Sequence, residues 1–308
     1  MAKKIKCALI TLALASVVTL SAAMSACTIK TDHPQAKITI KFNDVTYNID
    51  YTLYRNMYPQ TVQHFIELAD EGFYNNMIVH DYKSGSDWFT GSYKYTGEDD
   101  SLYSPSTFSE YLENNYKEAE YYDLFNNGKL SPSVYTSISY ENDKKTVKPE
   151  NALPTLIGEF SDNQHNIEKN ALSAKFGALK MFYYDKGKSN QQAIVKNWAG
   201  QILTQNYKYN CATSIFSMQV GTSSYTASKY CVFGELKNDG ARNELEDLIE
   251  AIDDYTNEVG SSKFITSNVK TRIDLLDKYA VDEDRDIEVS FAMTSIPIII
   301  ESVKITKY

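Results

Sequence analysis

The sequence predicts a mainly β protein, a closed antiparallel barrel capped by two helices and carrying a partly helical insertion. Apolar and polar residues alternate in many short runs, which is typical of strands with one buried face. Two segments, Gln60–Glu71 and Ala241–Ile252, instead show the apolar stripe of an amphipathic helix. The last apolar runs, between Ile287 and Ile305, are strands again. Such a return to strands at the end of the chain favours closure of a barrel.

The first predicted elements are a hairpin and a helix. Alternating apolar residues from Ile38 to Tyr51 are interrupted by the turn residues Asn43 and Asp44, as expected for two paired strands. In the helix that follows, Pro59 suits the first turn and Gly72 suits the C-terminal exit. The chain then returns to a strand at Met77–Tyr82.

Two segments interrupt the strand pattern. Ser92–Leu153 is polar and rich in tyrosine, and its capping box at Thr107–Glu110 predicts a helix that ends near Gly128. We expect this helix to pack on its own domain, with a partner as the alternative. Asp253–Asp284 is charged and is predicted to be a second, partly helical insertion. No repeat or interdomain linker is visible, so residues 37–308 are predicted to form one domain. Between the insertions the sequence predicts strands at Gly177–Tyr184, Ser214–Val220 and Tyr230–Gly234.

The N-terminus has the order of a secretory signal. Three lysines precede the apolar run Cys7–Leu20, which is shorter than the roughly 20 residues of a membrane span. Met24–Cys27 is similar to the bacterial lipobox, in which the cysteine becomes the lipidated first residue of the mature chain. The similarity implies a signal peptide over residues 1–26, a polar tether over 27–36, and extracytoplasmic anchoring to the bacterial membrane through lipid on Cys27. A plain signal peptide beside an incidental cysteine is the alternative.

Composition excludes several function classes. Three of the 31 lysines and arginines belong to the predicted signal, which leaves 28 against 40 acidic residues and a formal charge of −12. This charge opposes binding of nucleic acid. The four histidines show no ligand spacing with cysteine or acidic residues, so neither a metal nor another cofactor is predicted. Cys211 and Cys231 are compatible with a disulfide or with two buried thiols, and the oligomeric state stays open.

Several motifs, in order, resemble the cyclophilin-type peptidyl-prolyl isomerase family. Tyr58–Tyr82 resembles the start of that domain, where a proline-capped helix runs into GFY and then a strand written HR plus an apolar residue. The resemblance implies an eight-stranded barrel, rotation about Xaa–Pro bonds as the family activity, and proline-containing peptides or exported proteins as clients. Later segments match family motifs in the same order: Gly158-Glu159-Phe160 with Asn163, Gly177–Met181, Ser214–Met218, Tyr230–Gly234 and Pro297–Ile305.

The resemblance also assigns the positions of the catalytic groove. In the family, an arginine donates to the prolyl nitrogen and carbonyl region while an apolar pocket holds the proline. Asp81 stands at the arginine position, and an ionised carboxylate cannot donate a hydrogen bond. Lys83 lies two residues further along the strand, on the same face, and is either a substitute cation or an ion-pair partner of Asp81.

Other groove positions have also changed. In an ungapped alignment, the family's glutamine falls on Phe89, and its pocket phenylalanines fall on Ser86 and Ser217. Tyr225 stands at the position of the family's groove tryptophan and Tyr230 at that of its histidine, and both are aromatic residues with a polar tip. The simpler interpretation of Phe216 is that it belongs to the barrel core. The expected peptide groove comprises Phe89, Phe216, Met218, Tyr225 and Tyr230.

Three functions follow from these observations. The favoured one is a membrane-anchored, extracytoplasmic cyclophilin-like protein that binds prolyl peptides of exported proteins with isomerase activity weak or lost. The second is an active isomerase that assists their folding. The third is a surface interaction protein that works through the tyrosine-rich insertion Ser92–Leu153.

Overall fold

The computed structural model describes eight stretches of the chain: residues 31–97, 115–163, 165, 171–181, 191–207, 214–226, 231–272 and 288–308. The chain divides into two compact units, one comprising residues 1–31 with Tyr308 and the other comprising Asp32–Lys307. In the first unit, the N–H of Thr31 donates to the carbonyl of Tyr308 at 2.9 Å. No helix among the described residues is long and apolar enough to cross a membrane.

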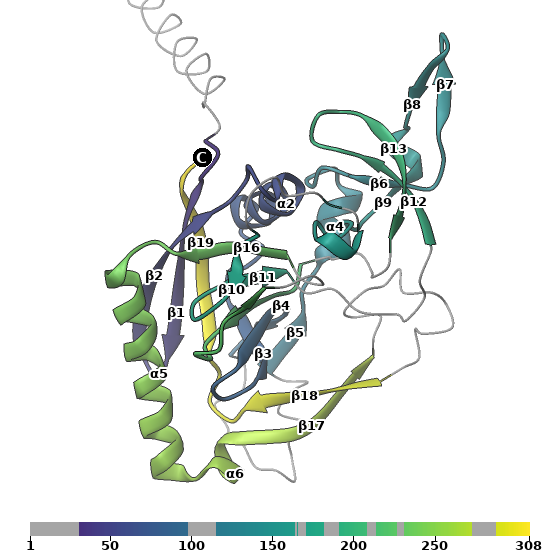
Figure 1. Ribbon diagram of the computed structural model, residues 1–308. Helices are drawn as coiled ribbons and strands as arrows, with labels where there is room; N and C mark the ends of the chain where they lie inside the picture. The colour runs from purple at the N-terminus through teal and green to yellow at the C-terminus, as the bar shows by residue number, and fades with distance from the viewer. Residues whose placement is uncertain are drawn as a thin grey trace, which may run out of the picture. The chain divides into compact units, whose positions relative to one another are not determined.

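Eight antiparallel strands of the larger unit form a closed barrel (Figure 1). Their order is β14-β11-β16-β2-β1-β19-β3-β4, and pairing of β4 with β14 closes the circle. The predicted eight-stranded barrel is therefore confirmed. A ninth strand, β5 (Tyr116–Glu118), pairs with β4. The barrel strands are β1 (Gln35–Phe42), β2 (Val45–Leu53), β3 (Met77–Tyr82), β4 (Asp87–Tyr95), β11 (Leu179–Met181), β14 (Phe216–Gln219), β16 (Cys231–Leu236) and β19 (Ile299–Lys307).

Helix α2 (Pro59–Asp70) packs its apolar stripe on the barrel core, as the sequence predicts. The ring of Phe65 lies 5.4 Å from that of Phe216 and 5.1 Å from that of Phe233, so the helix joins strands β14 and β16 through one aromatic cluster. Cys231 is fully buried in the core, and its thiol lies 3.7 Å from the hydroxyl of Thr61. Cys211 lies outside the described residues.

Helix α5 (Asp239–Val259) is longer than predicted. The side chain of Asn238 accepts from the N–H of Ala241 at 2.9 Å and caps the first turn. Leu245, Leu248 and Ile252 are buried and contact the core beside β2, which confirms the predicted stripe. A short helix, α6 (Ser261–Phe264), follows and inserts Phe264 into the same core.

The insertions form small sheets of their own. The described part of Ser92–Leu153 contains α4 (Tyr121–Asn126) and a short 3₁₀ helix, η1 (Pro149–Asn151), while the predicted capping box lies outside the described residues. A second 3₁₀ helix, η2 (Ser161–Asn163), follows the insertion. Two sheets contain the insertion's remaining strands. In the first, β7 (Ser139–Glu141) pairs with β8 (Lys144–Thr146). In the second, β6 (Val134–Tyr135) and β9 (Ala152–Leu153) join two later strands, β12 (Gln191–Lys196) and β13 (Ile202–Tyr207), in the order β13-β12-β6-β9.

Two further strand pairs complete the unit. β10 (Ser173–Ala174) pairs with β15 (Tyr225–Thr226). β17 (Ile265–Arg272) pairs with β18 (Glu288–Thr294). The described part of Asp253–Asp284 is therefore partly helical, as predicted, because it contains the end of α5 and all of α6, and strand β17 follows them. The apolar run beginning at Ile287 does not enter the barrel. Its strand β18 instead contacts β3 from outside the barrel sheet (Figure 1).

Gly91 occupies the closure of the barrel between β4 and β14. Its φ of +103° lies in the region that favours glycine, and an added Cβ would meet the carbonyl oxygen of Ser214 at 2.4 Å. The hydroxyl of Ser214 donates to the carbonyl of Gly91 at 2.7 Å. A side chain at position 91 would therefore force the closing strands apart.

We predict that Gly91→Ala destabilises the protein more than Gly85→Ala does. Gly85 also has a positive φ, of +63°, but an added Cβ there meets no atom within 4 Å. The control should therefore lose only the backbone cost of about 1–2 kcal/mol, while Gly91→Ala loses a further amount of about 1–3 kcal/mol from overpacking. Free energies of unfolding in urea would measure both. Equal losses would contradict the closure argument.

Candidate functional site

A transverse row of residues crosses four strands on the outer face of the barrel. Cα pairing joins Asp81 in β3 to Phe89 in β4, Phe89 to Ser217 in β14, and Ser217 to Lys180 in β11. Directly facing residues of antiparallel strands project to the same side of a sheet. Trp88, adjacent to Phe89, belongs to the barrel core, so the row lies on the opposite face.

Asp81 is buried, with only 6% of its surface exposed. One carboxylate oxygen, Oδ2, lies 3.0 Å from the ammonium of Lys83. The other, Oδ1, accepts a hydrogen bond from the backbone N–H of Ala292 at 3.0 Å. A buried carboxylate needs such partners, because its charge loses the solvation of water. The position that resembles the family's arginine site is therefore negative and already bonded within the chain.

Strand β18 supplies the cover over this position. Phe291 is buried, and its ring lies 5.0 Å from the ring of His80, the residue before Asp81. Met293 packs in a small apolar cluster with Ile78 of β3. The chain's own strand thus lies over the outer face of β3 at Ile78, His80 and Asp81.

His80 is fully buried beneath this cover. Its Nδ1 lies 3.0 Å from the hydroxyl of Ser92. Burial, assisted by the nearby charge of Lys83, lowers the pKa of His80 from 6.5 to about 3. The imidazole is therefore neutral at physiological pH and acts as a packed, hydrogen-bonded residue.

Lys83 forms the ion pair that was one of the two expectations for it. Besides Asp81, its ammonium lies 4.9 Å from the centroid of the Phe89 ring, within the range of a cation–π contact. The Lys83 side chain remains 53% exposed. Phe89 is half-buried and contributes an apolar surface next to this cation.

Lys180, at the far end of the row, had no role in the sequence interpretation. Its side chain is buried, and its ammonium lies 2.6 Å from Oδ1 of Asp87. The same ammonium donates to the hydroxyl of Tyr225 at 3.3 Å and to the side-chain carbonyl of Gln219 at 3.4 Å. A lysine within the apolar run Gly177–Met181 was the available signal, because a strand buried on both faces accommodates lysine only beside partners.

The structure separates the other expected groove residues. Tyr225 is 42% exposed beside Lys180, at the open end of the row. Phe216 and Met218 lie in the barrel core, not in the groove, because they alternate with Ser217 along β14. Tyr230 and the lipidation candidate Cys27 lie outside the described residues. The described residues also contain no cluster of three or more histidine, cysteine or acidic side chains that could hold a metal.

We predict that His80 makes stability depend on pH. The folded-state pKa of about 3 lies below the ordinary 6.5, so the unfolded chain takes up the proton first as the pH falls. The stabilisation by neutral His80 is therefore fully present above pH 6.5 and is lost progressively toward pH 3. In His80→Asn, the slope of unfolding free energy against pH should be smaller over this range. The matched control is the exposed His33→Asn, and an unchanged slope in His80→Asn would contradict the assignment.

Comparison with known proteins identifies the scaffold. The family model for cyclophilin type peptidyl-prolyl cis-trans isomerase/CLD matches residues 37–272. Among solved structures, a cyclophilin type peptidyl-prolyl cis-trans isomerase of Cryptosporidium parvum is 15% identical, with a TM-score of 0.34 over 90% of this chain and 99% of that chain. Its structure in the presence of the dipeptide Ala-Pro is 11% identical, with a TM-score of 0.38 over 89% and 99%. No curated protein matches the chain.

The family match covers the barrel strands from β1 to β16 together with both core helices. It spans well over half of the 308 residues. The chain therefore belongs to the cyclophilin-type peptidyl-prolyl cis-trans isomerase family.

Proposed function

We propose that this protein is a membrane-anchored, extracytoplasmic cyclophilin-like protein that binds proline-containing segments of exported proteins, with isomerase activity weak or lost. One observation carries the loss of activity. At the position of the family's arginine stands Asp81, whose two carboxylate oxygens are bonded to Lys83 and to the backbone of β18. The function class follows from membership of the family.

The chemistry explains why this substitution matters. Rotation about a Xaa–Pro bond has a barrier of about 20 kcal/mol, and a catalyst lowers it by placing a hydrogen-bond donor at the prolyl amide. An ionised carboxylate offers no donor and repels the electron-rich amide. Lys83 carries donors, but its ammonium is paired with Asp81 and lacks the planar fork of a guanidinium.

Peptide binding has separate support. Phe89 belongs to the row and is half-buried, whereas Tyr225 is exposed and lies beside Lys180 at the far end of the row. Aromatic side chains with a polar neighbour suit the mixed apolar and amide surface of an extended peptide. Loss of a catalytic donor does not remove these contacts, so binding without efficient catalysis is the function that the described residues support best.

Active isomerisation is the second candidate, and the Lys83–Phe89 contact favours it. A cation held 4.9 Å above an aromatic ring combines, in one place, a donor and an apolar surface. A direct assay separates the two candidates.

We predict that a soluble fragment beginning after Cys27 does not accelerate Xaa–Pro isomerisation in a protease-coupled assay at micromolar protein. Asp81→Arg should restore little activity, because the new guanidinium would meet Lys83 and the N–H of Ala292. Asp81→Ala serves as the control that removes the carboxylate without adding a cation. A clear excess rate in the unaltered fragment, or full recovery in Asp81→Arg, would favour the active isomerase.

The proposed location rests on the N-terminal sequence. Charged residues, an apolar run and small residues precede Cys27 in this order. A lipid on Cys27 would hold the domain at the extracytoplasmic surface of the cell membrane.

We predict that full-length protein expressed in a bacterium incorporates labelled fatty acid and sediments with membranes. Cys27→Ser should lose both properties, because serine has no thiol to accept the lipid. Cys231→Ser is the matched control, since that thiol is buried in the barrel. Equal labelling of Cys27→Ser and unaltered protein would contradict lipidation at Cys27.

A further inference from the structure

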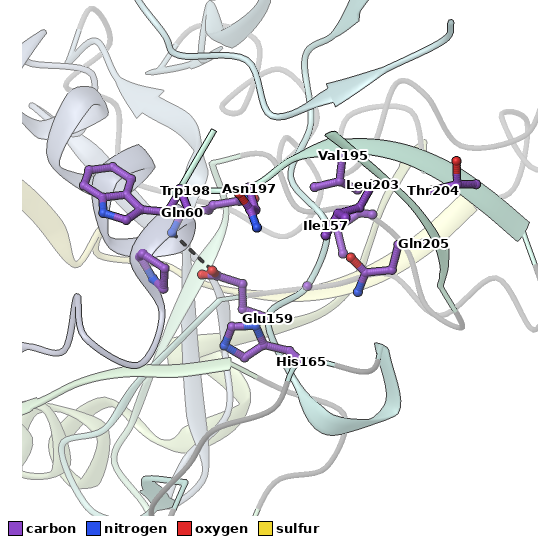
Figure 2. Close-up of a pocket in the computed structure, with 13 residues that line it drawn as sticks. Gln60, Ile157, Glu159, His165, Val195, Asn197, Trp198, Leu203, Thr204 and Gln205 are labelled. Atoms are coloured by element: carbon purple, nitrogen blue, oxygen red, sulfur yellow. Dashed lines mark hydrogen bonds between the residues drawn. The ribbon is translucent and has the colours of Figure 1, made fainter. Parts of the chain in front are cut away.

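A cavity of about 540 Å³ lies beside the start of α2 (Figure 2), and none of its lining residues belongs to the Asp81 row. Three parts of the chain form its walls: the start of α2, the segment around Glu159, and the β12–β13 hairpin. Figure 2 shows Trp198 on the side of α2, with Val195 and Leu203 on the opposite side and Glu159 and His165 between them. The volume is within the range of sites that bind small molecules or peptide side chains.

The hairpin is an addition to the barrel. Strands β12 and β13 fall between β11 and β14, whereas β11 and β14 pair directly in the barrel. β12 also pairs with β6 of the tyrosine-rich insertion. Two insertions therefore combine in one sheet, and that sheet closes one side of the cavity.

The mouth of the cavity exposes large apolar side chains. Trp198 is 49% exposed and Leu203 is 44% exposed. Deeper in the cavity, Ile157 and Val195 are buried, and Pro59 adds a further apolar surface. Exposed tryptophan and leucine beside a hollow are typical of an interaction site, because water solvates these surfaces poorly.

Hydrogen bonds hold the walls in place. The side-chain amide of Gln60 donates to the carbonyl of Lys196 at 3.2 Å and joins α2 to the hairpin. The amide of Gln205 donates to the carbonyl of Asn163 and joins β13 to η2. Asn197 donates to Gln201 across the hairpin turn at 2.9 Å. The cavity is therefore preformed, which reduces the entropy that a ligand must overcome.

The electrostatics favour a neutral ligand. None of the described residues that line the cavity is a lysine or arginine, so the described walls offer no ammonium or guanidinium to a phosphate or carboxylate. The carboxylate of Glu159 is directed to the start of α2, where it accepts from the backbone N–H groups of Gln60 at 3.2 Å and Thr61 at 2.8 Å. Burial raises the pKa of Glu159, and these donors together with the positive end of the helix dipole oppose that rise only in part.

We infer that this cavity binds an extended, proline-rich peptide segment, with one proline ring packed against Trp198 and another residue of the segment packed against Leu203 on the opposite wall. Such a segment adopts the polyproline II conformation, which has no internal hydrogen bonds and presents flat apolar rings to aromatic surfaces. Because the occupant is a peptide, this assignment rests on the peptide-binding function proposed above. It adds a binding site separate from the barrel groove.

A carbohydrate fits the same cavity less well. A sugar presents many hydroxyl groups and requires many polar partners, yet the amides of Gln60, Asn197 and Gln205 already bond within the chain. His165 is likewise engaged, with its Nε2 2.7 Å from the carbonyl of Met57. A mainly apolar occupant with few polar demands matches this lining better.

Trp198 provides a direct reporter of binding. The chain contains two tryptophans, and the other, Trp88, is only 2% exposed in the core. Titration with a blocked peptide of alternating alanine and proline should shift the emission to shorter wavelength and protect Trp198 from acrylamide. A peptide of equal length with serine in place of proline should have a much smaller effect. A chito-oligosaccharide that produces the shift when the proline peptide does not would overturn the inference in favour of a sugar.

Variants then locate the site by the anisotropy of a labelled form of the same peptide. Trp198→Ala should weaken binding about tenfold or more, as expected for an aromatic anchor, and Leu203→Ala should weaken it less. Tyr140→Ala, an exposed aromatic in the β7–β8 hairpin, is the matched control and should leave the Kd unchanged. Unfolding curves would verify that each variant is folded.

The outcomes separate this inference from the proposed function. If Phe89→Ala abolishes peptide binding while Trp198→Ala does not weaken it, the cavity assignment is wrong and the proposed function stands. If the unaltered protein binds no proline peptide, peptide binding itself is refuted at both sites.

Discussion

Closure of the barrel through the β4–β14 pair is the constraint on which the rest of the site depends. This pair places β4, the strand after β3, next to β14, which lies more than a hundred residues further along the chain. It aligns Asp81, Phe89, Ser217 and Lys180 in one row, although local sequence relates only the first two. The tight approach of Gly91 to Ser214 shows how little space the closure leaves.

Along that row, both buried charged side chains, Asp81 and Lys180, have partners within the chain. Asp81 meets a lysine and a backbone N–H, and Lys180 meets an aspartate, a tyrosine hydroxyl and a glutamine. Isolated charges at these depths would cost several kcal/mol each, so each substitution requires a compensating neighbour. The charged side chains Asp81 and Lys180 of this row are therefore bonded within the chain.

The barrel and both core helices could be predicted from sequence because their signals are local. Strand alternation and the stripe Leu245, Leu248 and Ile252 need no knowledge of distant contacts. Phe216, which the sequence also assigns to the barrel core, and Met218 pack inside the barrel, because side chains alternate between the two faces along β14. The cover by β18, the Lys180 network and the β12–β13 cavity join segments far apart in sequence. A local pattern can indicate that Lys180 needs polar partners, but it does not specify which distant segments supply them.

The cover by β18 has a consequence for competition. Because Ala292 and Phe291 belong to the same chain as Asp81, they are present at an effective concentration on the order of millimolar, however dilute the protein is. A free peptide that approaches Asp81 must displace this tethered occupant before it gains any contact there. A free peptide therefore binds β3 less readily than it binds surfaces that β18 does not cover. Dilution of the protein does not weaken this competition, because β18 belongs to the same chain.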